Sequence, residues 1–462
     1  MIEQGRIEVH CVSEKKKDAA YVLYWMQQSQ RVSYNHALNY AIEQANAYDV
    51  PLLVVFCITP DYVDANARHY QFMLEGLNEV ARRLSNLRIG FVLETSHPVS
   101  GIQKYMEKTE LLVMDKGYLH IQRKWREEVL QASRKCRDIS VVEVDTDLIV
   151  PVESASDKAE HAARTIRPKL WRQYPNFDHT PGSYIVNKPW ENRLLQGLRI
   201  CNQTQLLMEQ EYDQLMQSLG VEFSIAPSKL YHGGYTQAVR VIEEFFENRL
   251  NAYKDPSPVA RNTSRIGMYL HFGQISSLEV LKRLYAYVSI QKQKKNALDQ
   301  ESVDGFIEQI FIRRELAYNY VFYTQGYDQF ETMTDPWAYQ TMAQHIHDAR
   351  EYIYTLDELI ACQTHDVYWN DAMREMVETG YMHNYMRMYW CKKILEWSPS
   401  YAQAYANAIY LNNRYFIDGR DPNGYAGVAW CFGKHDHGWK ERPVFGKLRY
   451  MNANGLKRKF KM

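Results

Sequence analysis

Five short apolar runs in the first 150 residues constrain the fold of this chain more than any other feature. The runs have the length of strands and are rich in β-branched and aromatic residues. They cover residues 21–26, 51–58, 89–94, 110–114 and 139–144. Segments with helical periodicity, such as 32–48 and 66–86, lie between them. Because strands alternate with helices, we predict an α/β domain over residues 1–150, a Rossmann-like, mostly parallel sheet with helices on both faces.

The same region lacks the glycine motifs of two common nucleotide-binding classes. Neither G-x-G-x-x-G nor G-x-x-x-x-G-K-[ST] follows any of the predicted strands. The sequence therefore gives no support to an NAD-binding or a P-loop protein. A ligand of such a sheet would still be expected beyond the carboxyl ends of its strands.

The pattern changes after about residue 226, where helical periodicity takes over. Helical segments are predicted near residues 236–252, 275–296, 301–323, 356–362, 371–396 and 401–414. We therefore predict an all-α domain over 226–462. Residues 151–225 are predicted to be an interdomain linker that contains some helix.

Cysteine usage and hydropathy point to an intracellular protein. The seven Cys residues form no C-x-x-C pair, so neither a zinc site nor an iron–sulfur cluster is predicted. No apolar run reaches the roughly 18 residues that a membrane span needs, and the N-terminus has no signal-peptide core. We expect a monomer in the cytoplasm, or in the nucleus if the source is a eukaryote.

The charge of the chain is unevenly distributed although its formal net charge is zero. From Lys434 to the end there are nine Lys or Arg residues and only two acidic residues. A local basic stretch of this kind is typical of contact with a polyanion such as nucleic acid. A solvated basic tail is the alternative.

Three tryptophans in the C-terminal half could carry chemistry. Trp390 and Trp397 are seven residues apart, which places them on one face of a helix, and Trp369 lies just upstream. Core packing explains most tryptophans at this spacing. A redox relay is the second interpretation.

Charged residues near these tryptophans suggest a buried ion pair. Arg387 precedes Trp390, and a buried guanidinium requires a carboxylate partner. Asp418 and Asp421 are candidates, because they lie in a segment rich in Gly, Pro and Asn where functional groups often concentrate. An ordinary turn at a helix end is the alternative interpretation.

Two further polar sets interrupt the helical pattern. Asn262, Thr263 and Ser264 are candidate N-caps, and a helix N-terminus suits a phosphate. The apolar helical segment 306–320 contains the polar residues Gln309, Arg313, Arg314 and Glu315. Buried polar groups of this kind are usually paired, and some are functional.

The order of these motifs resembles that of class II cyclobutane pyrimidine dimer photolyases, in the photolyase/cryptochrome family. The resemblance is carried by NTS with YLHFGQIS, RRELA, THD with Trp369, YMRMYW with KKILEW, DGRDPNGYAG and GWKERPVFGKLRYM. It is dense over 226–462 and weaker upstream, in VLYWM and HYQFMLEGL.

The resemblance implies a folded FAD inside the helical domain and DNA with UV lesions as the partner. It assigns cofactor contacts to Tyr253, Thr263, Ser264, Arg314, Arg387, Asn412, Asp418 and Asp421. Arg387 would pair with Asp418 beside the flavin ring, and Asn412 would face flavin N5. The α/β domain could hold an antenna chromophore, often a deazaflavin.

The resemblance also implies residues for electron transfer and for the lesion. Trp390, Trp369 and Trp397 would connect the flavin with the surface. The lesion and its DNA would contact Gln309, Met388, Tyr354, Trp430, Arg313, Lys447 and Arg449. The implied reaction is light-driven splitting of a flipped-out pyrimidine dimer by an electron from excited, reduced FAD.

Several positions depart from the family pattern. Gln309 stands where a Glu is usual, and Tyr318 where an Asp is usual. The other departures are Ile266-Gly267-Met268 for Leu-Ser-Pro, Glu153-Ser154 for a segment with Trp, His36 for Trp, and His437 for Gln or Arg. They leave two alternatives open, a photolyase-related flavoprotein for the (6-4) photoproduct or a cryptochrome-like photoreceptor. A third is a structural protein without flavin, which an absorption spectrum would identify.

Overall fold

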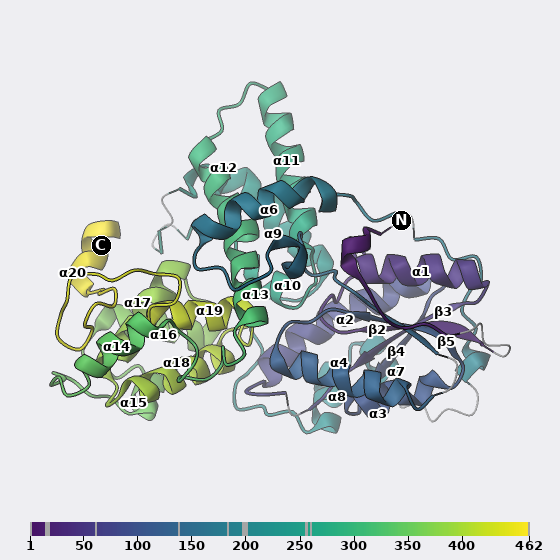
Figure 1. The fold of residues 1–462 in the computed structure, drawn as a ribbon, viewed down its shortest axis with the longest axis horizontal. Coiled ribbons are helices and arrows are strands. Elements are labelled where there is room, and N and C mark those ends of the chain that lie inside the picture. Colours follow the sequence, from purple (N-terminus) through teal and green to yellow (C-terminus); the bar gives the residue numbers. More distant parts are fainter. Residues whose placement is uncertain are drawn as a thin grey trace.

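The computed structural model describes residues 2–13, 19–60, 62–136, 139–182, 184–195, 202–254, 257–258 and 261–460. Lys461 of the predicted basic stretch lies outside the described residues. Figure 1 shows a sheet domain on the right beside a larger helical part on the left and top, with the C-terminal helix at the far left edge. The N-terminal α/β and C-terminal helical organisation predicted from the sequence is confirmed.

The N-terminal domain is built on a six-stranded, mostly parallel sheet. Its strands are β1 (Ile7–Cys11), β2 (Tyr21–Met26), β3 (Leu52–Cys57), β4 (Gly90–Glu94), β5 (Thr109–Asp115) and β6 (Ser140–Val144). They are arranged in the order β1-β6-β5-β2-β3-β4. Among the described strands, only β1 pairs antiparallel with its neighbour, β6. The five apolar runs are the five parallel strands, whereas β1 was missed because its residues are half-buried or exposed at the sheet edge.

Alternate residues of each buried strand face two helical layers. The helices α1 (His36–Tyr48) and α2 (Ala67–Asn86) pack on the face that includes Val22, Tyr24 and Met26. The opposite face, which includes Leu23 and Trp25, packs against α3 (Pro98–Met106) and α4 (His120–Ser133). Period-two alternation along strands that are buried throughout therefore produces one apolar core on each side of the sheet.

The segment predicted as a linker contributes helices to both parts of the molecule. It contains α5 (Val152–Ala155), α6 (Ala163–Phe177), η2 (Asn192–Leu195), α7 (Gln203–Glu209) and α8 (Tyr212–Leu219). Helix α6 packs into the core of the helical part. Helices α7 and α8 pack against α2 in the core of the sheet domain.

The remaining helices form the C-terminal part. They are α9 (Tyr235–Asn248), α10 (Gly267–His271), α11 (Ser277–Gln293), α12 (Gln300–Ile307), η4 (Glu308–Arg313), α13 (Arg314–Tyr323), α14 (Pro336–Gln344), α15 (Leu356–Ile360), α16 (Val367–Thr379), α17 (Asn384–Trp397), α18 (Tyr401–Tyr415), α19 (Pro422–Cys431) and α20 (Ala453–Phe460). None of the helices in the described part of the chain is long and apolar enough to cross a membrane.

Two helix predictions require correction. The predicted single segment 371–396 is two helices, because α16 ends at Gly380, whose φ of 81° suits glycine, and His383 caps the start of α17. The segment after Asp421 was interpreted as a loop or turn but is helix α19. Pro422 occupies its first turn, and the Asp421 side chain accepts a hydrogen bond from the Asn423 backbone N–H.

Buried arginines join the two parts of the molecule. Arg68 on α2 donates to the backbone carbonyls of Met376, Val377 and Tyr415, at 3.1, 2.6 and 3.0 Å. Arg31 donates to the carbonyl of Gly273 at 3.0 Å. Since these carbonyls lie where helices or loops end, the arginines replace the water that would otherwise satisfy them.

Candidate functional site

The helical part encloses a cavity of about 270 Å³. Its wall is formed by α10, the segment before it, η4, α13, α17, the end of α18 and the start of α19. Of the residues implied by the sequence, it brings together Tyr253, Thr263, Ser264, Gln309, Arg314, Arg387, Met388, Trp390, Asn412, Asp418 and Asp421. Tyr253 and Asp421, which are 168 positions apart in the chain, therefore line the same space.

An ion pair lies in the cavity wall. The Arg387 Nη2 lies 3.0 Å from Asp418 Oδ1, and its Nε donates to the Met382 carbonyl at 3.2 Å. The guanidinium also lies over the Phe416 ring, 3.9 Å from its centroid. Hydrogen bonds and stacking together fix the plane of the guanidinium at the cavity surface.

Arg314 belongs to a polar cluster that joins the cavity to the sheet domain. Its Nη2 lies 2.8 Å from Asp147 Oδ1 and 2.9 Å from the Tyr318 hydroxyl. The Tyr318 hydroxyl donates to Asp147 Oδ2 at 2.6 Å. Burial opposes the Arg314 charge, but the Asp147 carboxylate raises the pKa of Arg314 above its usual value. Tyr318 is therefore part of the domain contact, outside the residues that line the cavity.

Asp421 and Asn412 also line the cavity. Asp421 Oδ2 lies 3.0 Å from His271 Nδ1. Burial opposes ionisation of Asp421, but the His271 hydrogen bond lowers its pKa overall. Asn412 is buried against Gly424, where a Cβ atom would lie 2.8 Å from Asn412 Nδ2. A side chain at 424 would therefore force the Asn412 amide to move.

The predicted helix caps before α10 are wrong. Helix α10 begins at Gly267 after Ile266, and no side chain caps it. Thr263 instead shares a hydrogen bond of 2.5 Å with the Tyr381 hydroxyl, while Asn262 donates to the Ala252 carbonyl. Thr263 and Ser264 still line the cavity. Residues 263–265 therefore belong to the loop before α10.

Arg265, which follows these residues, was missed by sequence reasoning. It lines the cavity, has a φ of 59°, and its Nε is buried with no hydrogen-bond partner. An unpaired guanidinium N–H at a cavity wall is a ready donor for an anionic group. The positive φ gives no signal in the sequence, because arginine rarely adopts it.

The π-helical segment η4 ends at Arg313, and Arg314 begins α13. Gln309 and Ile310 in this segment face the cavity. Arg314 is buried, but Arg313 is exposed and its Nε lies 3.1 Å from Glu308 Oε1. Arg313, implied as a DNA contact, therefore lies on the surface outside the cavity. π-helical turns inside α-helices are frequent at functional sites.

The three implied relay tryptophans form a chain that starts at the cavity. Trp390 lines the cavity. The Trp369 indole N–H donates to the Trp390 carbonyl at 3.0 Å, and the rings of Trp369 and Trp397 lie 5.6 Å apart, centroid to centroid. Aromatic rings at this distance are in van der Waals contact. Trp369 and Trp397 are thus in ring contact, and Trp369 is joined to Trp390 through the Trp390 backbone carbonyl.

Two residues implied at the lesion lie elsewhere. Tyr354 is not among the cavity-lining residues and packs against Trp397, at the other end of the tryptophan chain. Trp430 lies on α19 but is also absent from the lining. The Arg449 guanidinium stacks over the rings of Trp430 and Trp439, at 5.3 and 4.8 Å.

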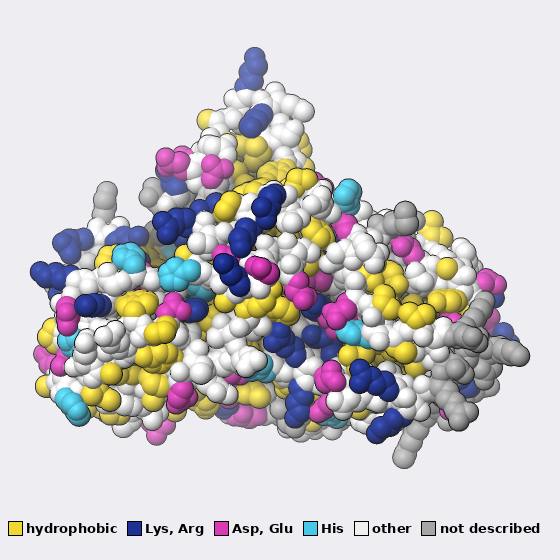
Figure 2. All heavy atoms as spheres, viewed as in Figure 1, with side chains coloured by type: hydrophobic (Ala, Val, Ile, Leu, Met, Phe, Trp, Pro, Cys, Tyr) yellow, Lys and Arg dark blue, Asp and Glu magenta, His cyan; other side chains and the backbone are white. Residues whose placement is uncertain are grey.

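Basic side chains gather around this aromatic set. Lys440, Arg442 and Lys447 are exposed in the segment between α19 and α20. Figure 2 shows Lys and Arg side chains gathered at the left edge of the molecule, near the C-terminal helix α20. Lysine and arginine interleaved with exposed aromatic rings suit a phosphate backbone and unstacked bases.

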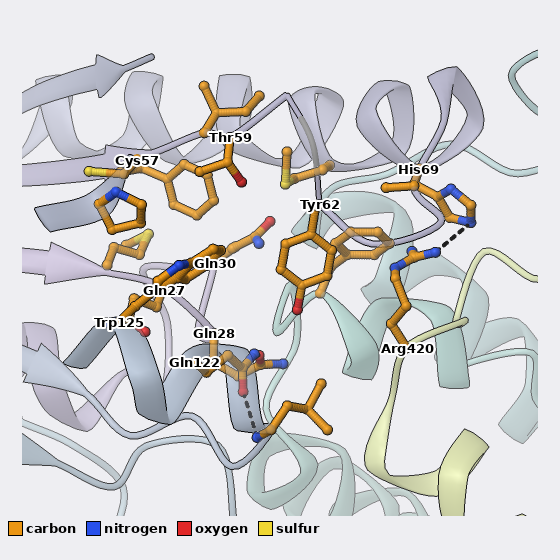
Figure 3. A pocket seen from close by; sticks show the side chains of 18 of the residues that line it. Gln27, Gln28, Gln30, Cys57, Thr59, Tyr62, His69, Gln122, Trp125 and Arg420 are labelled. Atoms are coloured by element: carbon orange, nitrogen blue, oxygen red, sulfur yellow. Dashed lines mark hydrogen bonds between the residues drawn. The ribbon is translucent and has the colours of Figure 1, made fainter. Parts of the chain in front are cut away.

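A second pocket, of about 120 Å³, lies at the carboxyl ends of β2 and β3 (Figure 3). Trp125 and Tyr62 contribute aromatic walls, and Arg420 closes the side toward the helical part. Both amide atoms of Gln27 and the Oε1 of Gln30 are buried without a partner. An apolar pocket with free amide groups at this edge suits a planar polar ligand. Sequence reasoning predicted the edge but not these residues.

Among the residues that the structure describes, one group of potential metal ligands lies at the sheet edge. Ligand atoms of Glu8, His10 and Glu143 are within 4.8 Å of one another. The Glu143 carboxylate is already paired with two cations. Its Oε2 lies 2.8 Å from Arg126 Nε, and its Oε1 lies 3.8 Å from Lys116 Nζ. These cations supply the positive charge that a metal would bring, so the group is accounted for as an ion-pair network.

Comparisons with known proteins agree with this architecture. A family model described as DNA photolyase matches residues 22–183. A crystal structure of a class III photolyase from Agrobacterium tumefaciens is similar in fold, with a TM-score of 0.68 at 16% identity, covering 97% of this chain and 85% of that chain. An archaeal photolyase from Sulfolobus tokodaii, solved with two FAD molecules, has a TM-score of 0.66 at 14% identity, covering 95% of this chain and 87% of that chain.

The sheet domain and the helical cavity are therefore those of a photolyase-type fold. A curated relative from Methanothermobacter thermautotrophicus, a deoxyribodipyrimidine photo-lyase, is 42% identical over 464 residues, covering 100% of this chain and 97% of the relative. The chain belongs to the photolyase/cryptochrome family.

Proposed function

We propose that this protein is a class II deoxyribodipyrimidine photo-lyase, which uses blue light to split cyclobutane pyrimidine dimers in DNA. The observation that carries the proposal is one cavity whose wall holds the Arg387–Asp418 pair and Asn412 and from which a chain of buried indoles departs. The relative that is 42% identical over nearly its whole length carries the same enzymatic name.

The cavity residues fit FAD. Arg265, with its free Nε, and the hydroxyls of Thr263 and Ser264 suit the diphosphate. Arg387, held by Asp418, and Asn412 suit the polar edge of the isoalloxazine. Bound FAD supplies absorption of blue light and the transferable electron. The protein binds and orients it, and excludes water from the cavity.

Gln309 and Met388 would contact the lesion from the same cavity. The Gln309 amide can donate to a pyrimidine carbonyl and accept from an N–H, but it cannot deliver a proton. A dimer must leave the base stack to enter the cavity, as in other base-flipping enzymes. Lys447 and Arg449 would hold the DNA backbone without reading its sequence.

The second pocket would hold an antenna chromophore of the deazaflavin type. Its aromatic walls suit a planar ring system, and the free amides of Gln27 and Gln30 suit ring carbonyl and imide groups. Mass analysis of chromophores released from the purified protein would test this part. Recovery of FAD alone from fully loaded protein would contradict it.

The function is tested by illuminating the reduced, FAD-loaded protein with DNA that contains either cyclobutane dimers or (6-4) photoproducts. We expect loss of the cyclobutane dimers in blue light and none in the dark. Gln309 in the cavity wall favours the (6-4) photoproduct as the second candidate substrate. Repair of that lesion alone would establish the second candidate and refute the first.

A matched pair of variants compares the loss of an arginine in the cavity wall with the loss of an arginine on the exposed surface. Arg387→Met removes the partner of the half-buried Asp418 carboxylate in the cavity wall, whereas Arg374→Met removes the partner of exposed Asp371 on α16. We expect the first variant to lose FAD and repair, and the second to keep both. Equal FAD content and repair in both variants would contradict the proposed site.

A further inference from the structure

Two buried cysteines meet at the wall of the helical cavity and have no part in the reaction proposed above. Cys391 on α17 is 2% exposed, and Cys431 at the end of α19 is 1% exposed. Both are free thiols and belong to the same apolar core. Cys391 also lines the cavity of about 270 Å³. The pair is therefore shielded from bulk solvent but within reach of a small molecule that enters this cavity.

Hydrogen bonds hold the end of α19 against one face of α17. Met388 and Cys391 are three residues apart on α17 and lie on the same face of the helix. The Cys431 sulfur lies 3.9 Å from the Met388 carbonyl oxygen, and the side chains of Cys391 and Cys431 are hydrogen-bonded to each other. Lys392 Nζ donates to the backbone carbonyl of Cys431. The two sulfur atoms thus face each other across the contact between α17 and α19.

A buried ammonium group lies beside the two thiols. Lys392 is 0% exposed. Burial lowers the pKa of Lys392, and the groups that oppose this effect most are Cys431 and Cys391. A buried charge is costly unless it is compensated, and two neutral thiols packed as apolar groups would not compensate it. An ionised sulfur would supply the missing negative charge.

The surroundings make the two thiols chemically unequal. Burial opposes ionisation of Cys431, but the hydrogen bond from Cys391 and the charge of Lys392 lower the pKa of Cys431 overall. The hydrogen bond to Cys431 and burial raise the pKa of Cys391 well above its usual value. Because the thiolate is the reactive form, Cys431 is the first sulfur to react, and Cys391 keeps its proton until the second step.

We propose that Cys391 and Cys431 form a redox pair that hydrogen peroxide converts into a disulfide between α17 and α19. The Cys431 thiolate attacks one peroxide oxygen, the O–O bond breaks, and hydroxide leaves a sulfenic acid on Cys431. The hydroxide takes up the proton that Cys431 released on ionisation. The Cys391 sulfur then attacks the sulfenic sulfur, its proton passes to the departing hydroxyl group, and water leaves. Overall, two thiols are oxidised and one peroxide is reduced to two waters.

The disulfide would fix two walls of the cavity relative to each other. Met388 of α17 lines the same space as Asn423 and Gly427 of α19. A covalent link between the helices restricts their separation, which an occupant of the cavity needs in order to leave. This consequence rests on the proposed function, because it takes FAD as the occupant. We expect FAD to leave the oxidised protein severalfold more slowly than the reduced protein.

Peptide mapping of peroxide-treated protein detects the link directly. The reduced, full-length protein is treated with hydrogen peroxide in the dark, its remaining thiols are alkylated, and it is digested with trypsin without reductant. We expect the peptide 388–392, which contains Cys391, to be joined to the peptide 421–434, which contains Cys431. Dithiothreitol should separate them. If both cysteines are recovered unmodified or irreversibly oxidised, and no joined peptides form, the proposal is overturned.

Variants test the partners and the buried charge. Cys391→Ser and Cys431→Ser should each abolish the joined peptides, whereas Cys362→Ser, at a half-buried cysteine that follows α15, is the matched control and should leave them unchanged. The wild-type map decides the proposal even if a serine variant fails to fold. Lys392→Gln can still donate to the Cys431 carbonyl but carries no charge, so its disulfide should form only at higher pH than in the wild type. An unchanged pH profile would overturn the role of Lys392.

The outcomes distinguish this inference from the proposed function. Release of FAD from oxidised and reduced protein is followed by flavin fluorescence, and equal rates would overturn the effect on the cavity while leaving the disulfide. Joined peptides in a protein that repairs no lesion would refute the proposed function alone. A protein that repairs dimers but yields no joined peptides would refute this inference alone.

Discussion

Glu315 should make the stability of this protein fall as the pH rises through neutrality. It is buried on α13 and accepts the backbone N–H groups of Ile149 and Val150, at 2.7 and 3.2 Å. These residues follow the last strand of the sheet domain, so Glu315 joins the two parts of the molecule. Burial raises the pKa of Glu315 from 4.5 to about 8, although the two N–H groups oppose the shift.

The direction and size of the effect follow from this shift. Below pH 4.5 the carboxyl is protonated in both states, and above about pH 8 it is ionised in both. Between these values the folded chain holds a proton that the unfolded chain has lost, so the free energy of unfolding falls with rising pH. At 1.36 kcal/mol per unit, the full shift corresponds to an upper limit of about 5 kcal/mol.

Chemical unfolding of the wild type and Glu315→Gln between pH 5 and pH 8 would measure the effect. Gln can still accept the two N–H groups but does not titrate, so the variant should gain stability over the wild type by up to several kcal/mol across this range. Glu301→Gln is the control, because its side chain is 83% exposed. If the difference between wild type and Glu315→Gln does not change with pH, the reasoning is refuted.

Three further predictions concern the relay, the cofactor and the domain contact. Trp369→Phe should slow photoreduction of oxidised FAD, measured by flash absorption, while repair by pre-reduced enzyme continues; unchanged photoreduction would contradict the relay. Arg265→Met should weaken FAD binding by about 10- to 100-fold in a titration, which is the effect of losing one hydrogen bond to a charged group. The control variant Arg313→Met, at an exposed position, should bind FAD as tightly as the wild type. Arg68→Met should lower the free energy of unfolding by about 3 kcal/mol in urea, because buried carbonyls lose their donor; a loss below about 1 kcal/mol would show that water replaces it.

The sheet was predictable because its parallel strands are buried on both faces. Such strands appear as continuous apolar runs, and all five were recognised with small errors at their ends. Edge strand β1 carries half-buried and exposed residues and left no such run. Helix α19 was not predicted because local propensity counts its two glycines, Gly424 and Gly427, against a helix. Of these, Gly424 lies directly against the Asn412 side chain.

The candidate site was predictable only in part. Arg387 and Asp418 were matched through motifs, and the structure brings them together although they lie 31 residues apart. Arg265 and the glutamines of the second pocket have no motif and no periodicity, so only their unpaired buried atoms identify them. Tyr354 was assigned to the lesion by resemblance, but its contacts with Trp397 and His365 depend on where two loops converge.

The departures from the family pattern do not bear equally on the reaction. Tyr318 replaces the usual Asp, but its hydroxyl is bound to Asp147 and Arg314 in the contact between the domains, where it can change stability rather than chemistry. Gln309 replaces the usual Glu in the cavity wall itself. Because an amide cannot carry the negative charge of a carboxylate, the lesion would meet a less acidic wall at this point. Lesion preference should therefore depend on position 309 and be insensitive to position 318.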